Sequence, residues 1–488
     1  MSTATVETRV HADWLVARPG APAQRGAAIR MEAGRIAAVE AAAPTGNGLI
    51  ALPGLANAHD HARAFRTTAF GAFDKPLEGW LFYLGVIPGV DPYLAAATSL
   101  ARSAMRGVGR VMVHYTRAQG LTDPLTEALA VARAARAVGT HVGFAVALRD
   151  RRPLAYAESA QVLPFLPAAI RDSVAARLAG PPPSPAAQMA LADEIAAACH
   201  SEDFNVQYGP NGVQWCSDEL LGLVAESSAR HGRQVHMHLL ETRYQREWAD
   251  HAYPGGIVAH IKALGLLSPR LTLAHCAHAR PGELEMIAES GAVIAVNTSS
   301  NLSLRSGIAP VAEMLRRGCK VAMGLDGCAF DEDDDALREM RLLYHLHKGW
   351  GYEVAVTPAQ GFALACRHGR QAVSGVACAG TVEAGEPADL LLLDGHTLME
   401  DRIFDDVPVL DFVLARANAG HVRQVIVAGK TIVMDGAATG VDYPALMTEL
   451  MAQLKSKLDP GDRWRATVQS LDAALKPFYL QGRHFGCG

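Results

Sequence analysis

Eight short apolar segments of strand length recur along the middle of the chain, and Ala- and Leu-rich stretches typical of helices lie between them. Several of these stretches begin with Ser, Thr or Pro and end with Gly, the usual start and stop signals of helices. The eight segments are 55–61, 108–116, 141–148, 204–210, 234–241, 271–278, 293–300 and 321–327. Strand and helix repeated eight times predict an α/β fold, a (β/α)8 barrel of the TIM type.

The two ends of the chain have a different pattern. Residues 1–54 and 377–436 carry alternating or apolar strand patterns without long helices. Neither end is long enough to form a domain alone, so we expect both to combine into one small β-sandwich domain beside a barrel domain at 55–376. Residues 437–488 are helical and then irregular in pattern, with no readable role.

Composition and charge exclude several classes of protein. The formal net charge is −5, with 45 basic and 50 acidic residues, which argues against a nucleic-acid-coating protein. No apolar run approaches the roughly 20 residues that span a bilayer, and the first residues lack the pattern of a secretory signal. The eight cysteines show no CxxC pair, which is typical of free thiols in a reducing compartment. We therefore expect a cytoplasmic location, with no nucleic-acid partner and no membrane contact.

Polar residues stand at the end of nearly every predicted strand. In a barrel of this type the carboxyl ends of the strands and the loops after them form the active site. One or two polar residues would only mark the passage from strand to loop, but His or carboxylate on strands 1, 5, 6 and 8 together favours a site. The residues are His59, His61, His114, Arg149, Tyr208, Asn211, His238, Glu241, His275, Asn297 and Asp326.

Four of these residues have the chemistry of a metal site. His59 and His61 stand two apart on a strand and therefore point to the same face. Zinc accepts neutral imidazole nitrogen and carboxylate oxygen, and a catalytic site leaves one position for water. His238 on strand 5 and Asp326 on strand 8 complete such a set. His236 shares a face with His238 but lies farther from the strand end, so we expect it to pack one layer down.

Two further residues are candidates for proton transfer. Glu241 lies just past strand 5, where it could act on a metal-activated water as general base and then as general acid. The alternative is a carboxylate at a helix N-terminus. His275 ends strand 6 and could hold the water or polarise the leaving group, with a purely structural role as the alternative.

Three further local features lie outside this set of candidate residues. Asp60, between the two histidines, should point towards the barrel wall as a structural residue. The Pro-rich stretch 179–187 is either part of a lid or a passive surface loop. Residues 331–335, of sequence DEDDD, are interpreted as a solvated helix start rather than as a second metal site.

In this order and spacing, PGLANAHDH, HMHLLET, LAHCAH and MGLDG resemble the amidohydrolase superfamily. The resemblance is to its branch of cytosine, guanine and S-adenosylhomocysteine deaminases and s-triazine hydrolases. The flanking segments 379-AGTVEAGEPADLLLLD-394 and 424-QVIVAGKTIVMDG-436 resemble the family's small β-domain. The segment 76-PLEGWL-81, which carries Trp80, resembles the loop after the first metal motif. The likeness covers roughly residues 8–436.

The resemblance implies one divalent metal ion, Zn²⁺ or alternatively Fe²⁺, bound by His59, His61, His238 and Asp326. It further implies that Glu241 moves protons, that His275 orients the nucleophile and that Asp326 helps to activate the water. The activity implied is that of a mononuclear metal-dependent aminohydrolase acting on a ring C–N bond of a nitrogen heterocycle, of purine, pterin, pyrimidine or triazine type. The family also suggests a homo-oligomer, a homodimer or a higher assembly.

Two alternatives remain open at this point. An amidohydrolase with the same metal site could instead cleave an amide, a cyclic urea or a substituted-amine leaving group. A non-catalytic barrel scaffold is the other alternative, although all the expected metal-binding and catalytic positions are present. The strand at 204–210 holds no lysine, which disfavours the binuclear members of the superfamily that use a carboxylated lysine there.

The substrate-binding residues match no signature of a particular deaminase. Asn297 stands where related sequences often carry histidine, and Asp331 stands near a position often occupied by asparagine. Arg149 and His114 could receive an anionic or carbonyl-rich substrate, or else anchor loops. The candidates for substrate contact are Trp80, His114, Arg149, Asn211, Gln214 and Asn297.

Overall fold

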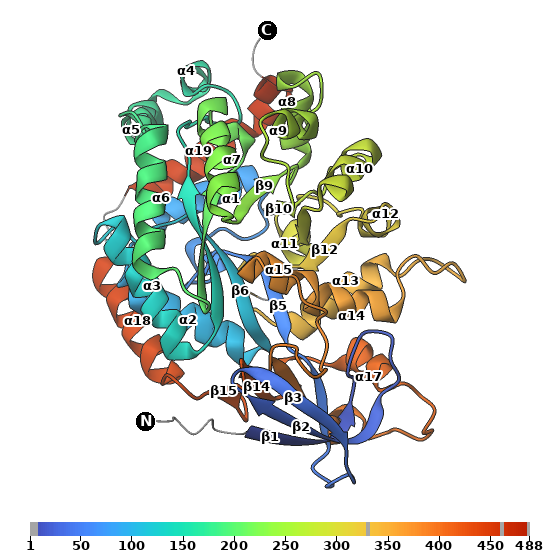
Figure 1. The fold of residues 1–488 in the computed structure, drawn as a ribbon. Coiled ribbons are helices and arrows are strands. Elements are labelled where there is room, and N and C mark those ends of the chain that lie inside the picture. The colour runs from blue at the N-terminus through green and yellow to red at the C-terminus, as the bar shows by residue number, and fades with distance from the viewer. Residues whose placement is uncertain (1–7, 328–331, 459–462, 486–488) are drawn as a thin grey trace.

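Two eight-stranded sheets organise the chain in the computed structural model, which describes residues 8–327, 332–458 and 463–485 (Figure 1). One sheet consists of parallel strands that follow one another in chain order and so confirms the predicted barrel. The first and last strands meet where the Asp326 amide donates to the carbonyl of His59 at 2.8 Å. The strands are β5 (Leu55–Asp60), β6 (Val108–Tyr115), β7 (His141–Leu148), β8 (Phe204–Pro210), β9 (Val235–Leu239), β10 (Leu271–His275), β11 (Val293–Val296) and β12 (Lys320–Met323).

Helices between the strands cover the barrel with small apolar side chains. Most of them begin at a Ser, Thr or Asp whose side chain accepts a hydrogen bond from the first turn, and several end at a glycine with positive φ. The main covering helices are α2 (Pro92–Met105), α3 (Pro124–Val138), α6 (Pro185–Cys199), α7 (Asp218–His231), α8 (Arg243–Ala252), α9 (Ile257–Ala263), α10 (Pro281–Ser290), α12 (Val311–Arg316), α13 (Ala336–His347), α14 (Pro358–Cys366) and α15 (His368–Ser374).

Three predicted segments, 271–278, 293–300 and 321–327, run three or four residues past the observed strand ends. The segment 293–300 leaves the sheet after Val296, and its last residues belong to helix α11 (Thr298–Ser303). Asn297 stands between the two elements with φ −116° and ψ 76°. Ser, Thr and Asn are poor strand residues, and here they start a helix at the barrel mouth.

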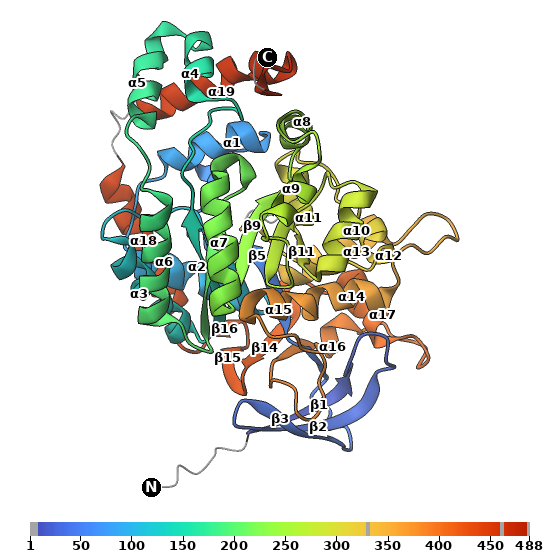
Figure 2. The ribbon, with the colours of Figure 1, turned by 45° about the horizontal axis from the view of Figure 1, so that its top comes forward.

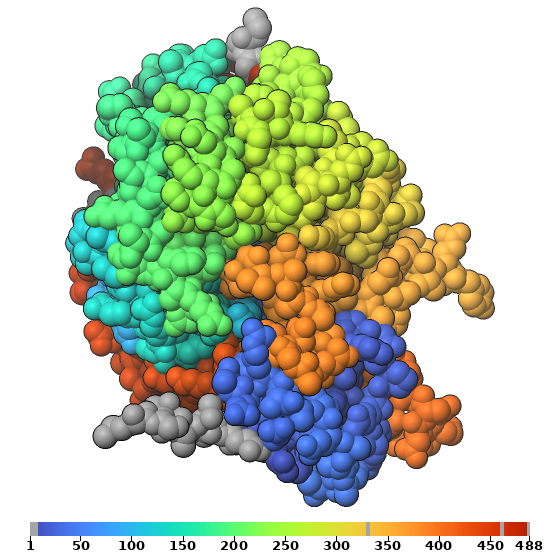
Figure 3. All heavy atoms as spheres, viewed as in Figure 1, coloured from blue at the N-terminus to red at the C-terminus, as the bar shows by residue number. Residues whose placement is uncertain are grey.

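The second sheet is built from both chain ends, as expected for a separate β-domain (Figures 1 and 3). N-terminal strand β4 lies between β1, to which it is parallel, and β13, to which it is antiparallel, so neither chain end forms this sheet alone. The order is β16 (Ala437–Ala438), β15 (Lys430–Met434), β14 (Val422–Val427), β13 (Leu390–Asp394), β4 (Leu49–Pro53), β1 (Thr8–Leu15), β2 (Gln24–Glu32) and β3 (Arg35–Ala41).

The C-terminal tail packs along the barrel and over its mouth. Helix α18 (Tyr443–Lys457) lies against α2. Helix α19 (Trp464–Leu480) contacts α1 (Leu77–Tyr83) and α5 (Ala168–Leu178), beside α4 (Ser159–Val162) (Figure 2). Leu471, Leu475, Phe478 and Tyr479 of α19 share a buried apolar cluster with the chain segment 154–174. The tail therefore has a structural role that the sequence did not predict.

The interpretation of residues 331–335 was right about the helix start and wrong about solvation. Asp335 is the N-cap of α13, where it accepts from the amides of Leu337 and Arg338. Asp334 is buried and forms an ion pair with Arg102 at 2.6 Å, because a buried carboxylate requires a partner. Asp331 lies outside the described residues.

The cysteines and the lengths of the helices were also the subject of expectations from the sequence. The cysteines of the described part of the chain, six in number, are free thiols. Within the same residues, no helix has the length and the apolar character needed to cross a bilayer.

Candidate metal centre and reaction cavity

The two histidines of strand β5 approach the same carboxylate. Nε2 of His59 lies 3.3 Å from Oδ1 of Asp326, and Nε2 of His61 lies 3.0 Å from the same oxygen. Asp60, between them, turns its carboxylate to the amides of His61 and Ala62 and to the side chain of Asn57. The alternation of side chains along the strand end therefore separates two candidate ligands from a structural residue.

Hydrogen bonds to backbone carbonyls fix the orientation of two imidazole rings. Nδ1 of His61 lies 2.7 Å from the carbonyl of His114, and Nδ1 of His238 lies 2.7 Å from the carbonyl of Asn211. A carbonyl oxygen can only accept, so Nδ1 carries the proton in both rings and Nε2 keeps its lone pair. The two Nε2 atoms face each other at 3.4 Å, so their lone pairs repel unless a cation or a proton lies between them.

Asp326 is held in place by hydrogen bonds from two neighbouring side chains. Ser300 donates a hydrogen bond to Oδ2 at 2.6 Å, and the guanidinium of Arg63 donates to the backbone carbonyl. Burial alone would raise the pKa of this carboxyl, but His59, His61 and Arg63 hold it well below its usual value. Its φ is 60°, a left-handed conformation that costs a non-glycine residue about 1 kcal/mol or more and occurs often at functional sites. Asp326 is therefore a fixed, ionised carboxylate.

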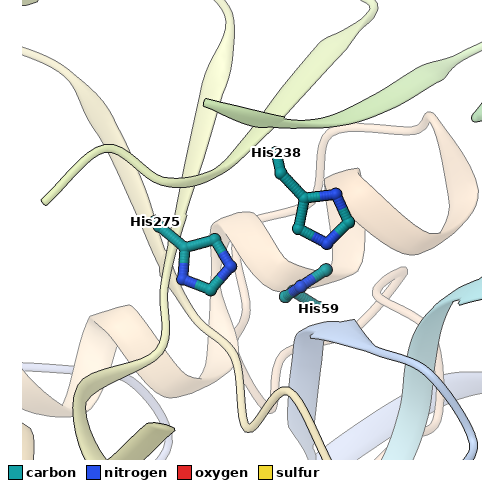
Figure 4. A group of neighbouring side chains, drawn as sticks. All are labelled: His59, His238 and His275. Carbon is teal, nitrogen blue, oxygen red and sulfur yellow. The ribbon is translucent and has the colours of Figure 1, made fainter. Parts of the chain in front are cut away.

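The donor atoms of this cluster fit a divalent cation. Burial lowers the pKa of His59, His238 and His275, so these rings are neutral and offer lone pairs. Both ring nitrogens of His59, Nε2 of His275 and Oδ1 of Asp326 are buried without a hydrogen-bond partner. His59, His238 and His275, from three different strands, surround a common space (Figure 4) and offer atoms within 4.8 Å of one another. Unpaired buried atoms are costly, and a bound cation would satisfy one ring nitrogen of His59 together with Nε2 of His275 and Oδ1 of Asp326.

Glu241 and His275 lie at one side of this cluster. Nε2 of His275 is 3.7 Å from Oε2 of Glu241, and both carboxylates of the site, Glu241 and Asp326, can join His275 in one ligand set. Burial and the nearby charge of Asp326 raise the pKa of Glu241 well above its usual value. The site thus contains one carboxyl that favours the ionised form and one that favours the protonated form, the arrangement expected of an acid and base pair.

A pair of glutamines supports the backbone at Glu241. Oε1 of Gln245 accepts from the Glu241 amide at 2.7 Å, and Nε2 of Gln245 donates to Oε1 of Gln214 at 2.8 Å. All three side chains are buried. Gln214, a candidate for substrate contact, does not line the cavity but reaches the site through Gln245. The two residues lie 31 positions apart, so no local sequence signal could have paired them.

The metal cluster opens into a cavity of about 370 Å³. Three of the candidates for substrate contact line it: Trp80, Arg149 and Asn211. Oδ1 of Asn211 is buried without a hydrogen-bond partner, and the described residues offer no hydrogen bond or ion pair to the Arg149 guanidinium. These two residues therefore have polar groups available to a ligand.

Two other candidates lie beneath the cavity wall. His114 is buried next to His236, with their Nδ1 atoms 3.4 Å apart. Asn297 is buried and holds Nδ2 3.2 Å from Nδ1 of His275. Neither residue lines the cavity. As expected, His236 itself is packed one layer down, stacked on His59.

Several cavity residues were missed by sequence reasoning. Arg63, four residues past His59, places its guanidinium over the indole of Trp80 at 4.8 Å from the ring centre. The carboxyl of Glu78 accepts hydrogen bonds from Thr242 and Tyr156 at 2.6 and 3.0 Å. Tyr479 comes from the tail helix. Glu78 lies in the quoted segment 76–81 and Arg63 lies two residues past the PGLANAHDH motif, yet neither was among the candidates, and no signal marks Tyr156 or Tyr479.

The Pro-rich stretch 179–187 does not line the cavity. The part of the same connection that does is Pro153–Tyr156, which lies closer to strand β7. Helix α6 instead anchors strand β7, because Gln188 accepts from the amide of Arg149.

Comparisons with known proteins agree with this geometry. The chain is 34% identical over 254 residues to a 5-methylthioadenosine/S-adenosylhomocysteine deaminase of Moorella thermoacetica, a match that covers 52% of this chain and 58% of that protein. The chain thus matches little more than half the length of such curated relatives. A zinc-bound adenosine deaminase from Xanthomonas campestris superposes with a TM-score of 0.72 at 22% identity, over 95% of this chain and 98% of that chain.

A zinc-complexed atrazine chlorohydrolase from Arthrobacter aurescens gives the same TM-score of 0.72 at 19% identity, over 91% of this chain and 98% of that chain. At such low identity these two structures establish the fold and nothing beyond it. The family model described as the amidohydrolase family matches residues 50–432, which include every strand of the barrel sheet, part of the end sheet and every residue of the metal cluster. The chain belongs to the amidohydrolase family.

Proposed function

We propose that this protein is a mononuclear metal-dependent aminohydrolase that releases ammonia from a nitrogen heterocycle of purine type. The proposal rests on a set of buried donor atoms without hydrogen-bond partners, which belong to His59, His275 and Asp326. The Nε2 atoms of His61 and His238 point into the same space, and the carboxyl of Glu241 lies beside it. Zinc is the cation we expect, because three imidazole nitrogens and one carboxylate suit a borderline metal.

The metal would be held by His59, His61, His238 and Asp326, and would supply Lewis acidity that makes a water molecule acidic near neutral pH. The chain's own groups then handle the protons. Oε2 of Glu241 lies at the cavity side of the cluster, where it can take a proton and return it to a ring nitrogen or to the departing amine. Nε2 of His275 faces the same space and can orient the attacking oxygen.

The cavity supports a flat and partly polar substrate. Trp80 and Trp215 offer aromatic surfaces, and Asn211 and Arg149 offer hydrogen-bonding groups at its wall. A volume of about 370 Å³ is near the lower end of the range for small-molecule sites. The deaminase relatives act on adenosine-type compounds by their names, so aminopurines and their nucleosides are the first substrates to test.

The decisive experiment is a screen of heterocycles for ammonia release by the metal-loaded protein. The panel should contain aminopurines, their nucleosides, aminopterins, aminopyrimidines and aminotriazines. We expect ammonia with one of these classes. A ring-opened acid as the sole product would replace the proposal by the hydrolysis of another C–N bond. Less than about half an equivalent of metal, with no activity after zinc is added, would favour a non-catalytic scaffold.

The role of Glu241 has its own prediction. Glu241→Gln keeps the shape of the side chain but cannot carry a proton between water and substrate, so turnover should fall by roughly 10²- to 10⁴-fold while metal content stays the same. Glu226→Gln is the matched control, because Glu226 is exposed on α7 and, among the described residues, its ion pair is with Arg230. Full activity of Glu241→Gln would remove this residue from the mechanism.

A further inference from the structure

The reaction cavity has a neighbour on the outside of the barrel mouth. This outer cavity has a volume of about 670 Å³ and is lined in part by Lys75, Tyr244, Asp472 and Lys476. Glu78, Phe82 and Tyr479 line both the reaction cavity and the outer cavity. These three side chains therefore form a wall between the reaction cavity and the outer cavity.

Tyr479 is the aromatic centre of the wall. Its ring lies 4.7 Å from the ring of Tyr244, which lines the outer cavity, and 6.4 Å from that of Tyr156, which lines the reaction cavity. Among the described residues its hydroxyl has no hydrogen-bond partner, and the side chain is buried. The ring thus fills the space between the cavities by its bulk and is not required to hold a hydrogen-bond network together.

The other two wall residues are less easily displaced. Glu78 is fixed by Thr242 and Tyr156, and Thr242 directly follows Glu241. Phe82 lies on α1, where it packs against the clusters formed with α19. Tyr479 by contrast belongs to α19, in the tail beyond the part of the chain that matches the family model. The tail is therefore free to vary the size of the site without change to the metal centre.

We propose that Tyr479 is a specificity-determining residue that closes the reaction cavity at its outer end and so limits the length of the substrate. This inference rests on the proposed function for its kinetic test. It predicts that a heterocycle with a short substituent fits against the ring of Tyr479, whereas a longer substituent collides with it. Removal of the ring should join the two cavities and admit the longer substituent.

The test uses the metal-loaded full-length chain and a series of 5′-alkylthio-5′-deoxyadenosines, from methyl to hexyl. In the wild type kcat/KM should fall steeply with chain length. Tyr479→Ala should raise the ratio of hexyl to methyl kcat/KM by about tenfold or more, since each methylene in an apolar site discriminates strongly. Tyr479→Phe keeps the ring and should keep the wild-type ratio. An unchanged ratio in Tyr479→Ala, or an equal rise in Tyr479→Phe, would overturn the proposal.

Phe478→Ala is the matched control for loosening of the helix. Phe478 is buried on the same helix, stands 5.7 Å from the ring of Phe165 and lines neither cavity. Phe478→Ala should lower the stability of the protein and leave the ratio of hexyl to methyl kcat/KM unchanged. A rise in this ratio as large as that in Tyr479→Ala would overturn the proposal. If the wild type releases ammonia from no heterocycle, the proposed function fails. The crystal structure of Tyr479→Ala then decides: joined cavities support the wall, and separate cavities overturn it.

Discussion

At the scale of single residues, the candidate metal centre depends on groups that do not touch the metal space. His61 and His238 offer Nε2 only because backbone carbonyls of His114 and Asn211 accept from Nδ1. Glu241 is positioned in the same indirect way, through Gln245 and Gln214. Outer contacts of this kind determine how precisely a site is held, and small displacements cost activity.

The glutamine pair gives a prediction at this scale. Gln245→Ala leaves the Glu241 amide without its acceptor, so Glu241 should shift and kcat should fall by about 10- to 100-fold, with KM nearly unchanged. Gln214→Ala should have a smaller effect in the same direction, because Gln214 acts through Gln245. Metal content, measured in each variant, should equal that of the wild type. If KM rises and kcat stays constant, the pair contacts the substrate rather than positioning Glu241.

The residues of the metal cluster could be predicted because each stands at a strand end in a recurring pattern. The substrate candidates could be predicted only in part. Arg149 and Asn211 follow their strands directly and line the cavity, whereas His114 points into the layer below, and Gln214 turns towards Gln245. A side chain's direction beyond a strand end depends on the loop conformation, and loop conformation comes from long-range contacts.

At the scale of helices and strands, the strands were predictable because short apolar runs define them. Their observed starts lie within one residue of the expected ones, whereas three of them end three or four residues earlier than expected. Helix α11 could not be predicted, because its polar residues follow an apolar strand in the sequence with no Gly or Pro between them. The amphipathic tail predicted helices, but α19 docks against the segment 154–174, more than 280 positions away. Pattern fixes the existence of a helix, and tertiary packing decides where it lies.

Helix α13 gives a prediction at this scale. The carboxylate of Asp335 caps the helix through the amides of Leu337 and Arg338, and it also accepts from the Ala419 amide at 2.9 Å. Asp335→Ala should therefore destabilise the protein by about 2 to 4 kcal/mol, the sum of a lost cap and an unpaired buried donor. Asp442→Ala at the exposed start of α18 should cost only about 1 kcal/mol. Equal losses in thermal unfolding would contradict a special role for Asp335.

At the scale of the whole molecule, one carboxylate joins the barrel to the end sheet. Asp389 precedes β13 and accepts from the amide of Ala428, next to β14. Its carboxylate also pairs with Arg110 of β6 at 2.5 Å and with Arg370 of α15 at 3.8 Å, both in the barrel. The Gly54 amide, between β4 and β5, donates to its carbonyl. These contacts link both chain ends to the barrel through one buried residue.

The Asp389 contacts predict a dependence of stability on charge. Asp389→Asn leaves Arg110 and Arg370 buried without their anion, so the melting temperature should fall by an amount that corresponds to about 3 to 5 kcal/mol. Asp401→Asn is the control, because its ion pair with Arg416 is exposed and such pairs contribute little. If both variants unfold at the wild-type temperature, Asp389 does not hold the two sheets together.

The same residue predicts how this difference changes with pH. Burial alone would raise the pKa of Asp389, but Arg110 and Arg370 lower it from 3.8 to about 2. The folded state therefore binds the Asp389 proton less tightly than the unfolded state does. This stabilisation, about 2 kcal/mol, is fully present above about pH 5 and is lost as the pH falls through 4 towards 2. Asp389→Asn lacks this charge contribution at every pH. The melting temperature of the wild type should therefore fall towards that of the variant between pH 5 and pH 3. A constant gap over that range would show that the side chain contributes through packing and not through its charge.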